Sequence, residues 1–282
     1  MLAVDLLHHY RAVSQKPLTV VDVETTGSIA LNGRMTEISV LQATLADGIQ
    51  SQQTALINPQ THIPAKIVEI TGITQAMVDA AAIAATILPD YLPLLSSGIL
   101  TAHNLKFDHS FLQAEYARLG ITFSRPAPEQ FCTVQLARLL LPELPSRSLP
   151  NLVQHFQFSV TTSHRAEADT IACWLLAKRL LTEISNEPDE ALLARFAQQW
   201  IPLKAAAKLL GCRSKRAQTL LDAAGVYSTE VEYSTYSTRR YRRGDVEQVY
   251  YQRQAESPEA RPEAELETES EEQPEATQLS CL

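Results

Sequence analysis

The chain has 282 residues, a hydrophobic fraction of 45% and a net charge of −8, which suits one large globular domain with a smaller one and excludes a disordered or membrane-spanning chain. The four cysteines are scattered without a C-x-x-C pair, which argues against a zinc knuckle and against a disulfide framework. Residues 1–16 lack the apolar stretch and cleavage site of a secretory signal, so we expect a cytoplasmic protein without a membrane partner.

Charge is distributed unevenly along the chain. Residues 1–199 carry 13 basic and 18 acidic side chains, residues 200–254 carry 10 and 5, and residues 255–282 carry 1 and 9. Segments of such different charge predict a large domain over residues 1–190, a small basic domain over 200–254 and an acidic tail. The tail has no aromatic residues and cannot bury a core, which predicts that it is disordered.

The stretch from Leu18 to Gly27 begins with β-branched and aliphatic residues, as a buried strand does, before two acids interrupt it. Asp22 and Glu24 are two residues apart, so on a strand both carboxylates point to one face. Burying two like charges together is unfavourable unless a cation lies between them. No Lys or Arg lies between Leu18 and Arg34, so a divalent ion with oxygen ligands, Mg²⁺ or Mn²⁺, explains the pair. The alternative is a strand end at which both acids are hydrated.

The following residues predict an α/β domain. Residues 18–58 read as a three-stranded antiparallel meander, with a hairpin turn at Ala46-Asp47-Gly48. Further along, the pattern predicts a helix from about residue 75, a helix over 87–95, a strand over 98–102, a helix to Leu119, a strand at 131–133, helices over 134–141 and 149–156, and a long helix after Asp169. Strands that later alternate with helices indicate a mixed sheet flanked by helices.

Two further acids, Asp108 and Asp169, stand where a strand or loop meets a helix. Taken singly, each is better explained as a helix-start residue that satisfies free backbone N–H groups. Together with Asp22 and Glu24 they provide four carboxylates, enough to hold two divalent ions, as phosphoryl-cleaving enzymes do. His164 precedes Asp169 by five residues. The unperturbed pKa of a histidine side chain suits a general base at neutral pH. Taken alone, His164 is better explained as an ordinary histidine in a surface loop.

Three segments occur in a characteristic order. They are Val21-Asp22-Val23-Glu24-Thr25-Thr26-Gly27, Ala102-His103-Asn104 with Phe107-Asp108, and His164-Arg165-Ala166 with Asp169. In order and spacing they resemble the motifs of the DEDDh group of 3′→5′ exonucleases, the proofreading family of bacterial replicative polymerases, and residues 70–74 resemble a further landmark. The resemblance covers about residues 16–183. It implies a ribonuclease-H-like fold and two divalent ions, with Asp22, Glu24, Asp108 and Asp169 as metal ligands and His164 as general base.

The same resemblance places five residues beside the terminal nucleotide of a nucleic acid: Thr25, Thr26, Gly27, His103 and Asn104. The first three are expected to offer backbone N–H and hydroxyl groups to the 3′-terminal nucleotide. For His103, a buried histidine that has its own hydrogen-bond partners is an equally good explanation.

The basic segment reads as a separate small domain. Residues 203–211 and 214–224 predict two short helices, residues 226–243 a hairpin and residues 244–254 a closing helix. With the pattern Arg-Arg-Tyr-Arg-Arg-x-Asp over 239–245, it resembles the winged helix-turn-helix of the MerR and excisionase group, which implies DNA binding. The expected phosphate contacts are Arg213, Lys215, Arg216, Arg239, Arg240, Arg242 and Arg243. The alternatives are a solvated basic face and a surface for the acids of the large domain.

The last five residues, 278–282, read Gln-Leu-Ser-Cys-Leu. They resemble the Gln-Leu-Ser/Asp-Leu-Phe motif by which bacterial replication proteins dock on the sliding clamp. Cys281 and Leu282 stand where Leu and Phe are usual. A chance match at a frayed terminus is the simpler explanation of so short a segment.

The sequence therefore predicts a metal-dependent 3′→5′ exonuclease of single-stranded or frayed DNA ends, with a role in DNA replication or repair. Nucleic acid is the expected partner, with a DNA polymerase or the sliding clamp as further ones. Two other functions stay open, namely the trimming of RNA 3′ ends and a DNA-binding regulator in which the nuclease fold is only a scaffold. The intact set of five catalytic residue types argues against the regulator.

Overall fold

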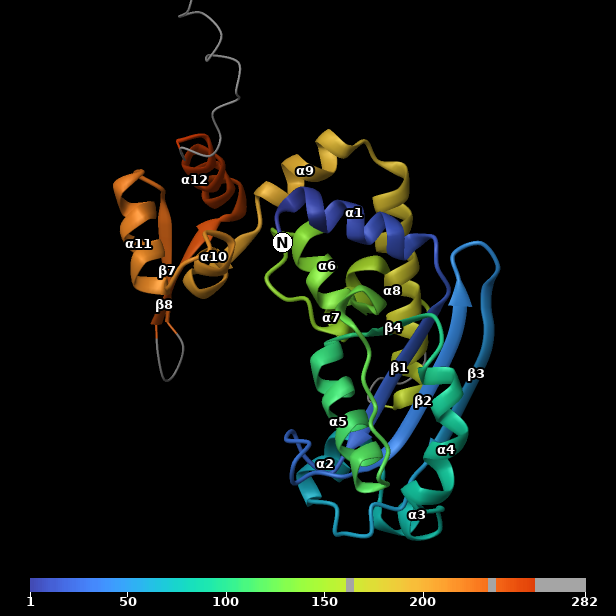
Figure 1. The fold of residues 1–282 in the computed structure, drawn as a ribbon. Coiled ribbons are helices and arrows are strands. Elements are labelled where there is room, and N and C mark those ends of the chain that lie inside the picture. Colours follow the sequence, from blue (N-terminus) through green and yellow to red (C-terminus); the bar gives the residue numbers. More distant parts are fainter. Residues whose placement is uncertain (161–164, 233–236, 257–282) are drawn as a thin grey trace, which may run out of the picture. The chain divides into compact units, whose positions relative to one another are not determined.

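The computed structural model describes residues 1–160, 165–232 and 237–256 (Figure 1). The chain divides into two compact units, residues 1–201 with 242–244 and residues 202–241 with 245–282. Among the described residues, none of the helices has the length and hydropathy that a bilayer crossing requires. The predicted disorder of the tail and the clamp-like motif concern residues 257–282, which lie outside the described residues.

A five-stranded mixed sheet in the order β3-β2-β1-β4-β5 forms the centre of the first unit (Figure 1). Its strands are β1 (Leu18–Thr25), β2 (Met35–Thr44), β3 (Gly48–Leu56), β4 (Ile99–Ala102) and β5 (Gln130–Cys132). The first three form the predicted antiparallel meander, and β4 and β5 continue the sheet parallel to β1. The prediction of an α/β domain with a mixed sheet is confirmed.

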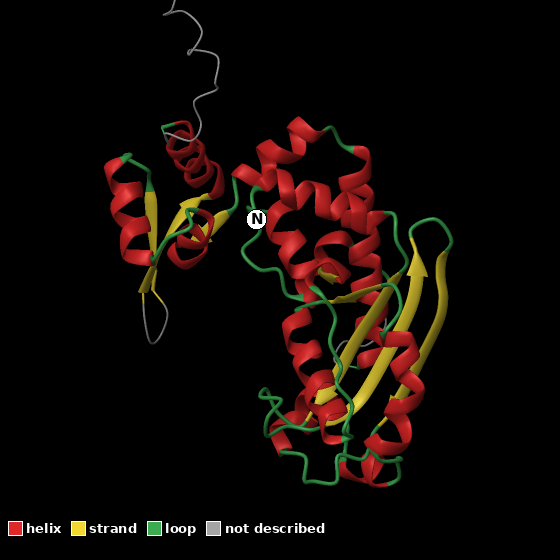
Figure 2. Ribbon diagram, in the orientation of Figure 1, coloured by secondary structure: helices red, strands yellow, loops and turns green. Residues whose placement is uncertain are grey.

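Helices cover both faces of the sheet (Figure 2). One face packs against α1 (Ala3–Ser14), α6 (Thr133–Leu140), α7 (Leu149–Phe156), α8 (Ala166–Asn186) and α9 (Asp189–Ala197). The other packs against α4 (Ala84–Leu95) and α5 (Leu105–Arg118). Shorter helices α2 (Ala65–Thr71), α3 (Gln75–Asp79) and η1 (Ala127–Glu129) lie in the connections. Because strand side chains alternate, Val20 belongs to the first core cluster and Val21 to the second.

Some helices differ from the sequence prediction. Helices α2 and α9 were not predicted, because each is short and its sequence pattern is weak. Helix α9 is stabilised by tertiary packing, since Leu192 and Phe196 are buried in the first core cluster. The prediction that α8 follows Asp169 was wrong, because α8 begins at Ala166 and Asp169 lies in its first turn.

The second unit has the predicted order of elements. Helices α10 (Leu203–Leu209) and α11 (Ser214–Ala223) pack together, and antiparallel strands β7 (Ser228–Glu232) and β8 (Ser237–Arg242) precede α12 (Arg243–Ala255). A short strand, β6 (Trp200–Pro202), precedes α10. Leu221 and Tyr241 are fully buried, so this small unit has apolar side chains shielded from water. Its assignment as a winged helix-turn-helix stays a prediction.

Candidate active site

Two of the four predicted metal ligands lie on β1. Strand β1 is paired with β2 along its whole length, and Asp22 and Glu24 project from the same face of it, the face that packs against α8. Apolar residues alternate with them, since Val21 and Val23 belong to the opposite core cluster. The sequence spacing therefore fixes the direction of both carboxylates as soon as β1 pairs with its neighbour.

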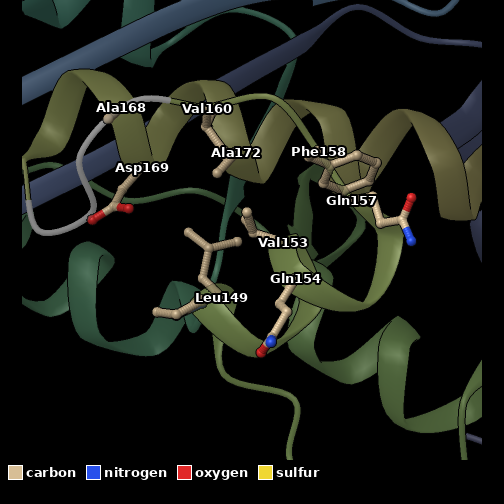
Figure 3. A pocket seen from close by; sticks show the side chains of 10 residues that line it. Leu149, Val153, Gln154, Gln157, Phe158, Val160, Ala168, Asp169 and Ala172 are labelled. Carbon is tan, nitrogen blue, oxygen red and sulfur yellow. The ribbon is translucent and has the colours of Figure 1, made fainter.

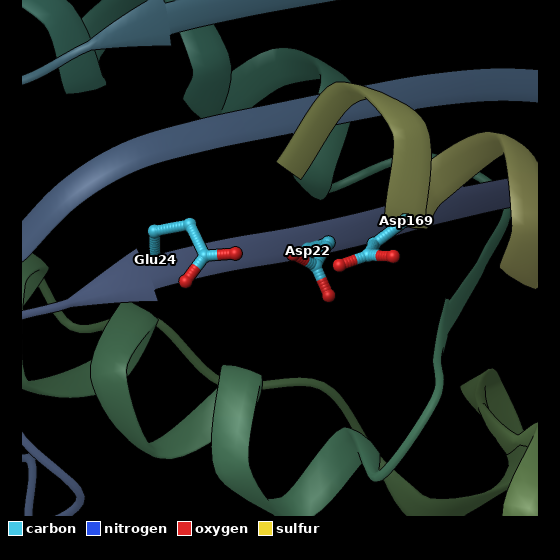
Figure 4. A group of neighbouring side chains, drawn as sticks. All are labelled: Asp22, Glu24 and Asp169. Carbon is cyan, nitrogen blue, oxygen red and sulfur yellow. The ribbon is translucent and has the colours of Figure 1, made fainter. Parts of the chain in front are cut away.

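Asp169 completes a cluster of three carboxylates (Figure 4). It lies in the first turn of α8, where its backbone N–H donates to the carbonyl oxygen of Arg165 at 3.0 Å. One carboxylate oxygen from each of Asp22, Glu24 and Asp169 can be chosen so that all three lie within 4.8 Å of one another. Helix α8 thus brings an acid that is about 145 positions away in sequence to the face on which the β1 acids project.

Asp108 approaches β1 from α5 and is almost fully buried. Strand β4 pairs with β1 only from Leu18 to Val20, so the last part of β1 has no strand on that side. Asp108 takes this place, because its Oδ1 accepts a hydrogen bond of 3.3 Å from the backbone N–H of Val23. A strand that stops early therefore gives a helix-borne carboxylate access to the neighbourhood of Asp22.

Burial and neighbouring carboxylates raise the pKa values of Asp22, Glu24 and Asp108. Burial raises the pKa of Asp22 well above its ordinary value, and the charges of Asp108, Asp169 and Glu24 add to the effect. Burial likewise raises the pKa of Asp108. Burial and the charge of Asp169 raise the pKa of Glu24 to about 7. Negative charge is costly in this site, and a divalent cation with a preference for oxygen ligands would remove that cost. The donor set therefore fits Mg²⁺ or Mn²⁺.

Thr25 and Thr26, two of the predicted substrate contacts, form hydrogen bonds within the chain between β1 and β2. The Thr25 hydroxyl donates to the carbonyl oxygen of Gly27 at 2.7 Å. Thr26 and Arg34 are joined twice, by Thr26 N–H to Arg34 O at 2.9 Å and by Arg34 N–H to the Thr26 hydroxyl at 3.0 Å. These contacts close the connection beside Glu24 into a defined shape. Their contact with a nucleotide stays a prediction.

His103 has a partner on each ring nitrogen. Its Nδ1 lies 2.9 Å from the Thr133 hydroxyl and its Nε2 2.9 Å from the carbonyl oxygen of Arg147. Because a carbonyl oxygen only accepts, Nε2 carries the proton. Burial lowers the pKa of His103 to about 4, so the ring is neutral at physiological pH. This geometry favours the satisfied, structural histidine. The neighbouring Asn104 is exposed at the start of α5, with a left-handed φ of 80°.

His164, the predicted general base, lies outside the described residues. The next residue, Arg165, is described, and it begins α8. Its guanidinium pairs with Glu37 of β2, a buried acid that the sequence reasoning did not select. The available signal was an acid at the start of a strand that is otherwise rich in apolar residues.

A cavity opens beside the carboxylates (Figure 3). It has a volume of about 320 Å³, and Asp169 lies at its edge. Its wall is mainly apolar and comes from α7, α8 and the chain that follows α7, with Leu149, Val153 and Phe158 among its residues. This cavity could not be predicted from the sequence, because its walls meet only in the folded chain.

Of the seven predicted DNA contacts, the three around the start of α11 are exposed. Arg213, Lys215 and Arg216 present their charges to solvent. Arg239 on β8 lies 3.2 Å from a carboxylate oxygen of Asp222, so part of its charge is already balanced.

The remaining predicted contacts, Arg240, Arg242 and Arg243, are less exposed to solvent and so less accessible to DNA. Arg240 is half-buried. Arg242 stacks over the ring of Trp200, with 4.3 Å between its guanidinium carbon and the ring centroid. Arg243 is buried, and its Nε donates to the side-chain oxygen of Gln199 at 2.9 Å. Arg242 and Arg243 therefore have structural contacts in place of an open charged surface.

Comparison with known proteins assigns the chain to a family. The RNase_T exonuclease family matches residues 19–176, a span that contains all four carboxylates and His164. The chain belongs to this exonuclease family. Enzymes of the family use two divalent metal ions, and the carboxylate cluster described above fits them.

Individual relatives are similar over the same part of the chain. A DNA polymerase III of the PolC type from Clostridium perfringens (strain 13 / Type A) is 33% identical over 171 residues, 60% of this chain and 12% of that protein. The 3′-5′ exonuclease DinG of Bacillus subtilis (strain 168) is 29% identical over 192 residues, 67% of this chain and 20% of that protein. This exonuclease-family chain thus spans a small part of the length of either relative.

A solved structure shares the fold. Escherichia coli exonuclease I in complex with a dT13 oligonucleotide aligns with a TM-score of 0.53 at 20% identity, over 59% of this chain and 41% of that one. This likeness confirms the predicted ribonuclease-H-like fold of the exonuclease domain.

The first prediction tests the carboxylate cluster. Asp22→Ala and Asp108→Ala should each reduce the exonuclease rate by about 10³-fold, since each removes several kcal/mol of metal-dependent stabilisation of the transition state. Their melting temperatures without metal should stay level or rise, because a repelling charge is removed. Nuclease assays and thermal melts in EDTA measure both effects. Asp90→Ala, which removes an exposed acid from α4, is the control and should change neither. If the Asp22→Ala variant digests single-stranded DNA at the wild-type rate, the assignment of the site is wrong.

The second prediction concerns pH. The pKa of Glu24 is raised from 4.5 to about 7 in the metal-free protein, so folding favours its protonated form. Stability should therefore fall as pH rises from about 4.5 to 7, and Glu24→Gln should lose this dependence. Thermal melts in EDTA across this range should show the variant gaining on wild type with increasing pH. A difference that is constant with pH would contradict the raised pKa.

Proposed function

We propose that this chain is a metal-dependent 3′→5′ exonuclease that removes nucleotides from single-stranded or frayed DNA ends, in DNA replication or repair. The observation that carries the proposal is the convergence of Asp22, Glu24 and Asp169, with Asp108 beside them, inside a chain of the exonuclease family. The 3′→5′ direction is supported by the name of the DinG relative.

The reaction is hydrolysis of the terminal phosphodiester. Water attacks the phosphorus atom, the bond from phosphorus to the 3′ oxygen breaks, and a nucleoside 5′-monophosphate leaves while the shortened strand keeps a 3′ hydroxyl. Bound divalent ions supply positive charge for the phosphoryl oxygens and lower the pKa of water. The four carboxylates would hold the ions, and His164 would accept the proton of the attacking water.

A digestion experiment tests the proposal. Oligonucleotides labelled at the 5′ end should shorten one nucleotide at a time in Mg²⁺, and EDTA should stop the reaction. Matched DNA and RNA oligonucleotides, assayed side by side, distinguish DNA degradation from the alternative of RNA 3′-end trimming. Metal-independent binding without any shortening would favour the DNA-binding regulator.

The third prediction concerns His164. A neutral imidazole acts as a base, so the rate should increase as pH rises through the pKa of His164. His164→Ala should slow turnover by about 10²–10⁴-fold and flatten this limb of the profile. Rates at saturating Mg²⁺ between pH 5 and 9 measure both. A variant that keeps the wild-type pH profile would place the base at another residue.

We also propose that the second unit binds nucleic acid through the start of α11. Arg213, Lys215 and Arg216 lie within four positions and are exposed, so they form a compact set of positive charges. Arg239 and Arg240 on β8 are half-buried and are secondary contacts in this proposal.

The fourth prediction tests this surface. Replacing Arg213, Lys215 and Arg216 by alanine should weaken DNA binding and reduce the salt dependence of log K by about 0.9 per lost phosphate contact. Hydrolysis of very short oligonucleotides should be unchanged. The control replaces Lys16, Lys66 and Lys178, three exposed lysines of the first unit, and so removes the same net charge. Equal salt slopes for the two triple variants would exclude a specific role of α11.

We further propose that the chain has a protein partner in DNA replication, a sliding clamp. Residues 278–282 would dock weakly on a bacterial sliding clamp, and residues 255–277 would tether the nuclease near a primer end. The fifth prediction is micromolar binding of a labelled tail peptide to the clamp, strengthened by Cys281→Leu with Leu282→Phe and measured by fluorescence anisotropy. Failure of both peptides to bind would leave the chance match as the explanation.

A further inference from the structure

Strand β2 places two residues directly opposite the metal ligands of β1. In the antiparallel register Glu37 is the partner of Glu24, and Ser39 is the partner of Asp22. Partners in such a ladder project from the same face, so both β2 side chains face α8 along with the carboxylates. Glu37 and Ser39 therefore lie beside the two metal ligands of β1 without being predicted ligands themselves.

Glu37 holds the beginning of α8. Its side chain is 1% exposed, and its two oxygens form a bidentate pair with Arg165, at 2.5 Å to Nη2 and 3.1 Å to Nε. The carboxylate oxygen that accepts from Arg165 Nε, Oε2, also accepts the backbone N–H of Ala166 at 2.9 Å. Arg165 is the N-cap residue of α8 and makes no side-chain cap of its own, so a carboxylate from the sheet caps this helix.

Ser39 holds the same helix one turn later. Its hydroxyl lies 2.9 Å from the Thr170 hydroxyl, and both groups are fully buried. The Gln52 amide of β3 donates to the Thr170 hydroxyl at 2.9 Å and to the carbonyl oxygen of Glu167 at 3.0 Å. The first turn of α8 is therefore fixed to the sheet on both sides of Asp169.

We propose that Glu37 is a positioning residue that sets the affinity of the metal site by holding Asp169 at the correct distance from Asp22 and Glu24. Glu37 is not itself a ligand, because Arg165 and the Ala166 N–H occupy both of its oxygens. Ser39 supports the same placement through Thr170. This inference rests on the proposed metal-dependent function.

The structure provides a matched control. Glu115 on α5 is also 1% exposed, pairs with Arg34 through both oxygens at 2.9 and 3.3 Å, and accepts the backbone N–H of Met35 at 3.1 Å. Its contacts are like those of Glu37, with a second ion pair to Arg118 at 3.1 Å, but they fix the start of β2 and not the helix of Asp169. Glu37→Gln and Glu115→Gln therefore both perturb a buried bidentate pair, and only the first should alter the metal site.

The experiment measures Mn²⁺ binding to the full chain by isothermal titration calorimetry. Glu37→Gln should weaken Mn²⁺ affinity by about 10–100-fold, as loss of a partner that orients metal ligands does. Its kcat should recover when the metal concentration is raised, and its KM for DNA should stay near that of wild type. Arg165→Lys, at a side chain that is 40% exposed, loses the bidentate pair and should show a smaller decrease in the same direction.

The outcomes separate the inference from the function on which it rests. Glu115→Gln should lower the melting temperature much as Glu37→Gln does, yet keep wild-type Mn²⁺ affinity. Equal Mn²⁺ affinity of wild type, Glu37→Gln and Arg165→Lys would overturn the positioning role while leaving the nuclease proposal intact. Absence of Mn²⁺ binding by wild type would overturn both. If Glu37→Gln does not fold, Arg165→Lys alone decides the question.

Discussion

Repulsion among the buried and half-buried carboxylates at the end of β1 is the interaction on which the site of the first unit depends. Asp22 and Glu24 project from one face of the strand, and helices α5 and α8 bring Asp108 and Asp169 toward them. Burial and the charges of their neighbours raise the pKa values of Asp22 and Glu24, so without a cation these two acids resist ionisation. Such a site is maintained only because strand pairing and two packed helices provide the stability elsewhere.

Pairing with arginine divides the buried acids of this unit into two kinds. Glu37 and Glu115 each form a bidentate pair and also accept the N–H of the residue that follows their arginine. Asp22, Glu24 and Asp108 of the cluster differ from these two acids, because burial and neighbouring carboxylates raise their pKa values. The paired acids fix the backbone at the starts of α8 and β2. The other acids are the predicted ligands of the divalent cations. Both kinds are needed, since ligands without fixed backbones would not keep their separation.

The arginines of β8 and of the start of α12 show how tertiary contacts determine the role of a charged side chain. Arg242 and Arg243 belong to the same run of basic residues as Arg239 and Arg240. In the folded chain Arg242 stacks on Trp200 and Arg243 is buried beside Gln199. A guanidinium has a flat apolar surface as well as five donors, so it serves packing as readily as it binds phosphate. The run in sequence could not distinguish these uses.

The sequence by itself determined the local chemistry. The spacing of Asp22 and Glu24 on a β-branched strand determined their common face, because side chains alternate along a strand. The Asp-Gly turn after β2 determined the hairpin, because Gly48 adopts the positive φ that such a turn requires. The motif resemblance already named Asp108 and Asp169 as the distant partners of these acids, but only the tertiary structure showed the contacts that place them. The pairing of Glu37 with Arg165, the partners of His103 and the cavity beside Asp169 depend on contacts between segments far apart in the chain. Local pattern carries no record of such contacts, since they arise when the helices pack on the sheet.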